Sequence, residues 1–168
     1  MIAILPRYFI RDMTLEDIPA VLEIDQVSFS NPWPERSYRY ELTENRAAQL
    51  FVAKLDDGAV IAYLGYWLFG DEAHISTFAV QPEFRMQGIG EDLLRNALAV
   101  AAERGARVAT LEVRESNDAA IRLYEKLGFE VTGNRDAYYR DNDEDAVLMT
   151  LYRISDLAQE EIASLRSQ

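Results

Sequence analysis

The chain has 168 residues, of which 49% are hydrophobic and 27% charged, and it contains no cysteine. This length and composition predict one globular domain, and the lack of cysteine excludes disulfides, thiolate metal sites and a cysteine nucleophile. The formal net charge of −12 argues against nucleic acid as a direct ligand, because phosphate contacts need clustered Lys and Arg. It suits cationic ligands such as amines or basic peptides, although acidity that only keeps the protein soluble explains it equally well.

The chain shows no pattern typical of membrane insertion or export. No apolar run approaches the roughly 20 residues that a membrane-spanning helix needs. The stretch Met1–Arg7 lacks the charged start, apolar core and cleavage site of a signal peptide. We therefore expect a cytoplasmic protein with no membrane partner.

The first 45 residues predict one strand followed by two helices. Residues 7–13 have the pattern of a strand, and Thr14 with Asp17 three residues later has the spacing of a helix capping box. The apolar face of the helix that follows consists of Ile18, Val21, Leu22 and Ile24. Two prolines in the segment 31–34 end this helix, and we expect a second, short helix through Tyr38 and Leu42.

Three strands and a longer helix are predicted next. The strands are Gln49–Leu55, Val60–Phe69 and Ala73–Val80, and Asp56-Asp57-Gly58 has the composition of a hairpin turn between the first two. From Gly88 to Glu103 the apolar residues recur at helical spacing, and Gly105 ends that helix as a C-terminal cap.

The last third of the chain predicts a further strand and helix, then two strands and a final helix. These are Val108–Val113, Asn117–Leu127, Phe129–Asp136, Ala146–Arg153 and the amphipathic stretch Leu157–Leu165. The order β-α-α-β-β-β-α-β-α-β-β-α predicts a mixed α/β domain built on a single sheet. We place this domain at residues 7–153 and a C-terminal helical extension at residues 154–168.

The turn between the strand ending at Val80 and the helix beginning near Gly88 has the features of an anion site. Glycines at positions 88 and 90 let the backbone approach a ligand closely, and the N–H groups of a helix N-terminus attract a pyrophosphate. Arg85 adds a positive charge. The spacing Arg-x-x-Gly-x-Gly differs from the common nucleotide-binding patterns, so a tight turn without ligand stays open as the alternative.

A second block, Leu111–Phe129, combines a strand and a helix. Asn117 is placed to cap the helix, and Tyr124 recurs with apolar residues at helical spacing, so from the residues alone it is more often a core residue than a catalytic one. His74, the only histidine, lies in a central strand, where a structural role is favoured over that of a base. One histidine without cysteine or spaced carboxylates predicts no metal site.

These two blocks resemble a known family. Arg85-Met86-Gln87-Gly88-Ile89-Gly90 is similar to the coenzyme A pyrophosphate loop, Gln/Arg-x-x-Gly-x-Gly/Ala, of the GNAT acetyltransferases. The block from residue 111 to 129, with Pro32-Trp33, Tyr138-Tyr139 and Glu144-Asp145-Ala146, resembles the bacterial ribosomal-protein-alanine N-acetyltransferases of the RimI type. The resemblance extends from residue 9 to residue 152.

The resemblance implies the GNAT fold, with about seven strands flanked by four helices plus a C-terminal helix, and acetyl-CoA as co-substrate without a metal. It implies that Glu112 is the general base and Tyr124 the general acid. The implied coenzyme A contacts are Phe78, Ala79, Val80, Arg85, Met86, Gln87, Gly88, Ile89, Gly90 and Asn117.

The implied chemistry suits these residue types. An α-amino group has a pKa of about 7.7–8.0, so it must lose a proton before it attacks a thioester. A carboxylate at position 112 can accept that proton directly or through a water, and a phenol at position 124 can protonate the departing thiolate in a ternary complex. The implied acceptor contacts are Trp33, Tyr138 and Tyr139, in the loops 31–38 and 138–144; ordinary packing under loops is the alternative.

We therefore expect an acetyl-CoA-dependent N-acetyltransferase that acts on a protein N-terminus, with a ribosomal-protein alanine as the substrate that the family suggests. One alternative is a GNAT enzyme for a small amine such as a polyamine, an aminoglycoside or an amino acid. Another is a noncatalytic acyl-CoA-binding module. The expected partners are a protein N-terminus or a small amine but no nucleic acid, and the expected assembly is a monomer or a homodimer.

Overall fold

The computed structural model describes residues 4–167. The chain divides into two compact units. Unit 1 contains Met1–Trp67 and Ser76–Ala97, and unit 2 contains Leu68–Ile75 and Leu98–Gln168. None of the helices in the described part is long and apolar enough to cross a lipid bilayer.

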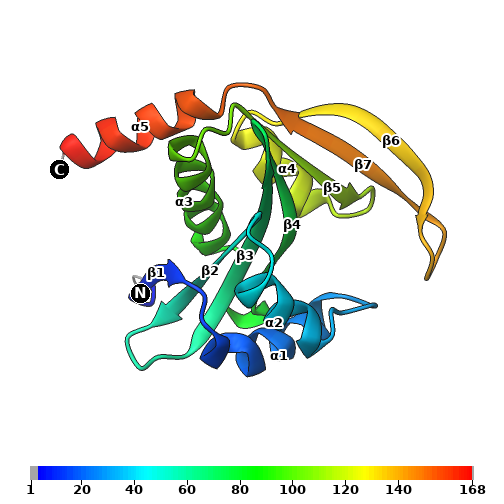
Figure 1. The fold of residues 1–168 in the computed structure, drawn as a ribbon, viewed down its shortest axis with the longest axis horizontal. Helices are drawn as coiled ribbons and strands as arrows, with labels where there is room; N and C mark the ends of the chain where they lie inside the picture. The colour runs from blue at the N-terminus through cyan, green and yellow to red at the C-terminus, as the bar shows by residue number, and fades with distance from the viewer. Residues whose placement is uncertain (1–3, 168) are drawn as a thin grey trace. The chain divides into compact units, whose positions relative to one another are not determined.

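The secondary-structure elements follow the predicted order (Figure 1). The strands are β1 (Tyr8–Asp12), β2 (Ala48–Leu55), β3 (Val60–Phe69), β4 (Glu72–Val80), β5 (Val108–Arg114), β6 (Glu130–Tyr139) and β7 (Glu144–Leu151). The α-helices are α1 (Ile18–Ser28), α2 (Glu35–Thr43), α3 (Ile89–Glu103), α4 (Asp118–Lys126) and α5 (Ile154–Arg166). Two short 3₁₀ helices, η1 (Leu15–Asp17) and η2 (Pro82–Phe84), precede α1 and α3. The predicted mixed α/β fold is confirmed.

The seven strands form one sheet in the order β1-β2-β3-β4-β5-β7-β6. β4 and β5 pair in parallel, with His74 opposite Thr110. β1 with β2, β2 with β3, β5 with β7 and β6 with β7 pair antiparallel. The prediction of a single mixed sheet is confirmed as well.

Unit 1 has a hydrophobic core between α1, α2 and the strands β2 and β3. The predicted capping box is present: the backbone N–H of Thr14 donates to Asp17 Oδ2 at 2.8 Å. It caps the 3₁₀ turn η1, and α1 begins only at Ile18. The buried core residues are Met13, Ile18, Val21, Ile24, Tyr38, Leu50, Val52, Val60, Tyr63 and Ala79.

In unit 2, strand β5 alternates strictly between buried and partly exposed residues. Ala109, Leu111 and Val113 are buried on one face. Side chains along a strand point alternately to opposite faces, so Glu112 shares the other face with Thr110 and Arg114. This alternation places the predicted general base on a face that solvent can reach.

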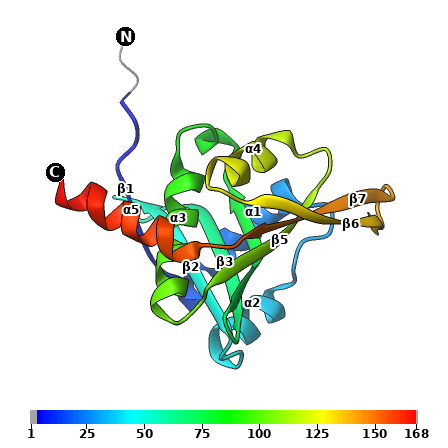
Figure 2. The same ribbon diagram turned by 90° about the horizontal axis from the view of Figure 1, so that it is seen from above.

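Strands β6 and β7 form a long hairpin in unit 2 (Figures 1 and 2). The sequence predicts that these strands stop at Asp136 and resume at Ala146, but the structure extends them to Tyr139 and back to Glu144. The pairing register shifts between Arg135 and Tyr139, and Ala137 has a positive φ of 49°. The irregular strand explains why its alternation is hard to read, and it places Tyr138 on β6, not in a loop.

The helix α5 begins at Ile154, three residues before the predicted start, so β7 ends at Leu151 and not at Arg153. In both views α5 and the tip of the β6–β7 hairpin lie at opposite ends of β7 (Figures 1 and 2). The amphipathic face predicted for this helix includes side chains that lie outside the described part of the structure. Gln168, the last residue of the predicted extension, lies outside it as well.

Candidate active site

Two hydrogen bonds hold the start of the predicted phosphate loop in unit 1, at the point where the chain leaves the sheet. The backbone N–H of Gln81 donates to the carbonyl of Ile61 at 2.8 Å, and its side-chain Nε2 donates to the carbonyl of Val60 at 3.2 Å. The chain then makes the short helix η2 and turns into α3. These two bonds fix the end of β4 against β3, so the loop starts from a rigid strand end.

Glycines shape the turn into α3. Gly88 has a φ of 83°, a region that L side chains rarely adopt, and a Cβ built on it would meet no atom within 4 Å. At Gly90 the constraint is lack of space, because a Cβ there would lie 3.3 Å from the ring of Phe78 and 3.4 Å from Val80. Gly88 therefore leaves open space beside a helix N-terminus, and Gly90 lets α3 lie close on β4.

The first turn of α3 provides N–H donors. The first N–H groups of any helix have no partner within the helix, and together with the helix dipole they attract anions. Met86 has a positive φ of 62° and a side chain that is 89% exposed. The loop can thus offer backbone donors to a diphosphate beside exposed and glycine-lined space.

The charged and polar side chains of the phosphate loop form hydrogen bonds with other groups of the same chain. Arg85 Nε donates to the carbonyl of Val80 at 2.9 Å, and its terminal nitrogen donates to Ser28 Oγ at 3.2 Å. Gln87 Nε2 donates to the carbonyl of Glu83 at 3.1 Å. In this structure Arg85 therefore fastens the loop to the end of β4 and to the last residue of α1, and its predicted contact with phosphate stays a prediction.

Glu112, the predicted general base, lies on β5 in unit 2 with 16% of its side chain exposed. Its Oε1 lies 3.1 Å from Arg135 Nε on β6. The hydroxyl of Tyr138 donates a hydrogen bond to the same carboxylate, and this bond is the main reason why the pKa of Tyr138 lies above its usual value. The carboxylate is thus held between a cation and a phenol, and it is partly accessible.

Tyr124, the predicted general acid, lies on α4 and is only 7% exposed. Its ring packs against Phe129 with 5.7 Å between centroids. Burial raises the pKa of Tyr124, and the neighbouring Tyr139 raises it further. The phenol is therefore protonated at neutral pH, as a proton donor must be.

Tyr138 and Tyr139, on β6 in unit 2, interact with these two groups. Their rings meet edge to face with 5.2 Å between centroids. Tyr138 contacts Glu112, and Tyr139 acts on the pKa of Tyr124. Unit 2 thus brings four of the predicted site residues together on β5, α4 and β6.

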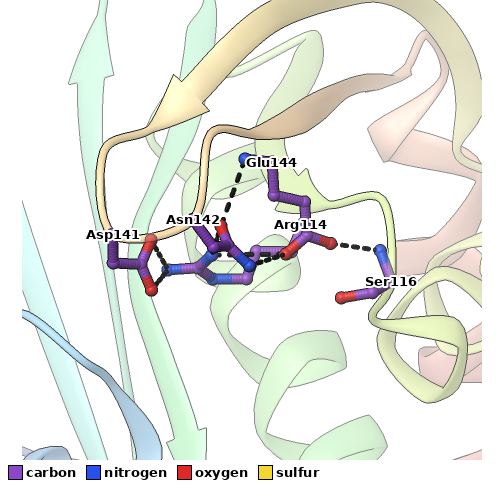
Figure 3. Close-up of polar contacts among 5 residues, drawn as sticks. All are labelled: Arg114, Ser116, Asp141, Asn142 and Glu144. Carbon is purple, nitrogen blue, oxygen red and sulfur yellow. Dashed lines mark hydrogen bonds and ion pairs between the residues drawn. The ribbon is translucent and has the colours of Figure 1, made fainter.

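Arg114 ties the hairpin tip to β5, as Figure 3 shows. One of its terminal nitrogens lies 3.0 and 3.1 Å from the two carboxylate oxygens of Asp141. The other lies 3.2 Å from Asn142 Oδ1 and 3.3 Å from Glu144 Oε2. The guanidinium also lies 3.9 Å from the centroid of the Tyr139 ring, within the range of a cation–π contact.

Glu144 extends this cluster to the start of α4 (Figure 3). Its Oε1 accepts the backbone N–H of Ser116 at 2.6 Å. Hydrogen bonds from Ser116, and then from Asn142 and Arg114, lower the pKa of Glu144 to about 2. The predicted cap is also present: Asn117 Oδ1 accepts the N–H of Ala120 at 3.2 Å. The strand that carries Glu112, the hairpin tip and the start of α4 are therefore held together by one charged cluster.

Trp33 and His74 contact their own surroundings. The ring of Trp33 stacks on Trp67 with 6.3 Å between centroids and packs against Tyr38 at 5.3 Å. His74 Nδ1 forms a 2.8 Å hydrogen bond with Thr110 Oγ1. Packing therefore accounts for the Trp33 ring, whose contact with an acceptor stays a prediction, and the histidine has the structural environment that the sequence favours.

The structure adds three charged residues to those expected from the sequence motifs. Arg114 lies two positions after Glu112, so strand alternation alone places both on one face. Asp25 occupies an apolar position of α1, four residues after Val21, and that pattern indicates a buried carboxylate. Arg135 reaches Glu112 across β7, which only the strand order and register reveal.

Comparisons with known proteins agree with this arrangement. A family model described as "Acetyltransferase (GNAT) family" matches residues 18–129. The chain is 44% identical over 140 residues to a Bacillus subtilis protein named as a candidate ribosomal protein bS18-alanine N-acetyltransferase, and the match covers 83% of this chain and 92% of that protein. It is 34% identical over 145 residues to the Escherichia coli (strain K12) ribosomal protein bS18-alanine N-acetyltransferase, with coverage of 84% and 95%.

Solved structures agree as well. The crystal structure of the ribosomal-protein-S18-alanine N-acetyltransferase from Escherichia coli matches with a TM-score of 0.78 at 34% identity, over 86% of this chain and 93% of that one. The family resemblance inferred from the sequence motifs is thereby confirmed. GNAT acetyltransferases take their acetyl group from acetyl-CoA. The chain belongs to the GNAT family of N-acetyltransferases.

Proposed function

We propose that this enzyme transfers the acetyl group of acetyl-CoA to the N-terminal α-amine of a protein, and that the acceptor is a ribosomal protein with an N-terminal alanine. The names of its relatives support this acceptor. The observation that carries the chemistry is the accessible carboxylate of Glu112, held beside Tyr138 in the same unit as the buried phenol of Tyr124. A ribosomal acceptor also supports a cytoplasmic location.

The loop before α3 is the proposed site for the diphosphate of acetyl-CoA. The open space beside Gly88 and the N–H groups at the start of α3 support this assignment, because they suit an anion. The strand residues Phe78, Ala79 and Val80 are proposed to pair with the pantetheine arm. Asn117 is proposed as a further coenzyme contact at the start of α4.

Glu112 is proposed to take the proton from the acceptor. The α-ammonium group has a pKa of about 7.7–8.0 and must be deprotonated before its nitrogen attacks the thioester carbon. A carboxylate within hydrogen-bond reach, directly or through one water, can accept that proton. The nitrogen then forms a bond to the carbonyl carbon, and the resulting tetrahedral intermediate collapses with loss of the thiolate. The second proton of the nitrogen passes to the thiolate or to solvent, which leaves the neutral amide.

Tyr124 is proposed to act on the thiolate. Its raised pKa keeps the phenol protonated, so it can donate a hydrogen bond to the sulfur as the carbon–sulfur bond breaks. An ordinary thiol has a pKa of about 8.5, below that of the buried phenol. Stabilisation of the thiolate by this hydrogen bond therefore precedes any full transfer of the proton.

The loop 31–38 and the hairpin segment 138–144 are each proposed to supply contacts to the acceptor peptide, among them Trp33, Tyr138 and Tyr139. Tyr138 supports this proposal because its side chain is exposed while its hydroxyl contacts Glu112. The net charge of −12 favours acceptors with basic residues after the first position, by long-range attraction.

The proposal is tested with acetyl-CoA and a panel of acceptors, by following thiol release. The panel contains peptides with N-terminal alanine, serine and methionine, the same alanine peptide with a blocked N-terminus, spermidine and an aminoglycoside. We expect turnover only with free peptide N-termini, and the highest kcat/KM with alanine. Turnover with the small amines alone, or coenzyme binding without turnover, would contradict the proposal.

A further inference from the structure

A buried carboxylate lies under the first of the two loops that we assign to the acceptor. Asp25, in the last turns of α1, is 1% exposed. Tyr38 of α2 donates to its Oδ2 at 2.5 Å, and the hydroxyl of Tyr63 on β3 donates to its Oδ1. The backbone N–H of Trp33 donates a third hydrogen bond. Donors from a loop, a helix and a strand therefore converge on one side chain, all within unit 1.

Burial of this carboxylate costs free energy, because a polar group is removed from water. Burial raises the pKa of Asp25 to about 6, although the bonds from Tyr38 and Trp33 oppose the rise. An apolar residue at this position of α1 would avoid the desolvation of a charged or polar group. The other buried positions of this helix near Asp25 are apolar, since Val21 and Ile24 are fully buried. The carboxylate must therefore provide something other than core stability.

The hydrogen bond from Trp33 indicates what that is. Residues 29–34 join α1 to α2, and prolines at positions 32 and 34 stiffen the segment around Trp33. The hydrogen bond from the backbone N–H of Trp33 to the buried side chain of Asp25 fixes the distance between the loop and the core. The exposed residues just before it, Phe29, Ser30 and Asn31, are then held in a defined place.

The same cluster reaches the strand proposed to hold the thioester. Thr77 Oγ1 donates to the hydroxyl of Tyr63 at 3.3 Å, and Thr77 directly precedes Phe78 on β4. Only two side chains, those of Tyr63 and Asp25, separate Thr77 from the Trp33 N–H. The position of the loop is thus set relative to β4, and not only relative to the core.

We propose that Asp25 is a positioning residue, which holds the loop 29–34 against β4 so that the acceptor amine meets the thioester. This inference rests on the proposed function, because it takes the loop as part of the acceptor site. Asp25 touches no reacting atom in this scheme. Its removal should weaken the use of the acceptor and leave the use of acetyl-CoA largely unchanged.

The kinetic test compares the wild type with Asp25→Asn, Tyr63→Phe and the control Tyr66→Phe. Tyr66 lies on the same strand and is equally buried, but its ring packs against Phe51. We expect Asp25→Asn to raise the KM for the alanine peptide about tenfold or more, since small displacements of a bound group are costly. The KM for acetyl-CoA should change less than about twofold, and Tyr66→Phe should leave both KM values near those of the wild type.

A second measurement needs no activity. Trp33 and Trp67 are the only tryptophans of the chain, and their rings stack. If Asp25 holds the loop, Asp25→Asn should weaken the near-ultraviolet circular dichroism of this pair and increase quenching of its fluorescence by acrylamide. Far-ultraviolet dichroism should stay that of a folded protein. If Asp25→Asn does not fold, Tyr38→Phe and Tyr63→Phe replace it in both measurements.

The outcomes separate the inference from the proposed function. An active wild type whose Asp25→Asn variant keeps its peptide KM and its tryptophan signals would overturn the inference alone. Equal increases in both KM values would also overturn it, because they indicate general loosening. A wild type that acetylates no peptide would remove the proposed function, and the role of the loop with it, even if the tryptophan signals responded as expected.

Discussion

Glu112 and Asp25 both accept hydrogen bonds from tyrosine hydroxyls, yet their surroundings differ. Glu112 lies at the partly exposed face of β5, with Arg135 and Tyr138 as partners. Asp25 is fully buried in unit 1, with Tyr38, Tyr63 and a backbone N–H as partners. A base must exchange its partners for a substrate, whereas a positioning group must keep them. Accessibility, and not residue type, therefore separates the two proposed roles.

The largest effect is expected from Glu112→Gln, which keeps the shape of the side chain and removes its basicity. Loss of a general base costs about 100-fold to 10,000-fold in rate, so we expect kcat to fall by that range in the thiol-release assay. The melting temperature should shift little, because the side chain is partly exposed. Glu115→Gln, an exposed carboxylate just after β5, is the matched control and should retain activity. An active Glu112→Gln variant would remove the distinction between the two carboxylates.

Tyr124→Phe is expected to have the next largest effect. The change removes only a hydroxyl from a buried ring that packs on Phe129, so the fold should persist. We expect kcat to fall about tenfold to 100-fold, which is within or just below the usual contribution of an acid catalyst. Tyr152→Phe, on an exposed tyrosine, is the control. Unchanged kcat would mean that Tyr124 is a core residue, as helical spacing alone suggests.

The order of the elements was predictable because its signals are local. The alternation in β5, the apolar spacing in α3 and the turn at Gly58 each depend on residues close together in the sequence. The cap at Asn117 is local as well, and the structure contains it. The same holds for the capping box, although it precedes a 3₁₀ turn that the pattern does not distinguish from the start of α1.

The contacts of the site were less predictable because they depend on register and on the environment of each side chain. The bond between Arg135 and Glu112 crosses β7, and β6 is irregular near that point. The side chain of Arg85 folds back onto Val80 and Ser28, although its charge suggests a phosphate contact. Family motifs identify which residues belong to a site, but they do not state which partners hold them.

A pair of identical changes sharpens the comparison between the carboxylates. Tyr63→Phe and Tyr138→Phe each remove a hydroxyl that donates to one of them. Loss of a hydrogen bond that leaves a buried acceptor unsatisfied costs about 1–3 kcal/mol, so we expect Tyr63→Phe to lower the free energy of unfolding by that amount. Tyr138→Phe should cost less than about 1 kcal/mol, because water can replace its hydroxyl. Urea unfolding measures both.

For kcat we expect the opposite order, with the larger effect from Tyr138→Phe and the smaller from Tyr63→Phe. Tyr138→Phe should lower kcat about threefold to tenfold, because it removes a partner that orients Glu112, the proposed base. Tyr63→Phe should leave kcat nearly unchanged and act on the KM for the peptide. Equal effects of the two variants on stability and on kcat would show that the two carboxylates have similar environments, which contradicts the comparison.

The smallest expected effect is the pH dependence that Asp25 gives to stability. Burial raises the pKa of Asp25 from 3.8 to about 6, so between these values the native state holds the proton more tightly than the unfolded chain. Raising the pH through this window therefore lowers the free energy of unfolding. From pH 5.0 to 7.5, a range above the pI of about 4.5, the loss from this group is about 1 kcal/mol.

Glu144 does not obscure the pH dependence of Asp25, because its lowered pKa of about 2 confines its contribution to more acidic solutions. Asp25→Asn should remove this slope in urea unfolding measured across the range, whereas Glu115→Gln should keep it. A slope that persists in Asp25→Asn would mean that the buried carboxylate titrates as an ordinary one.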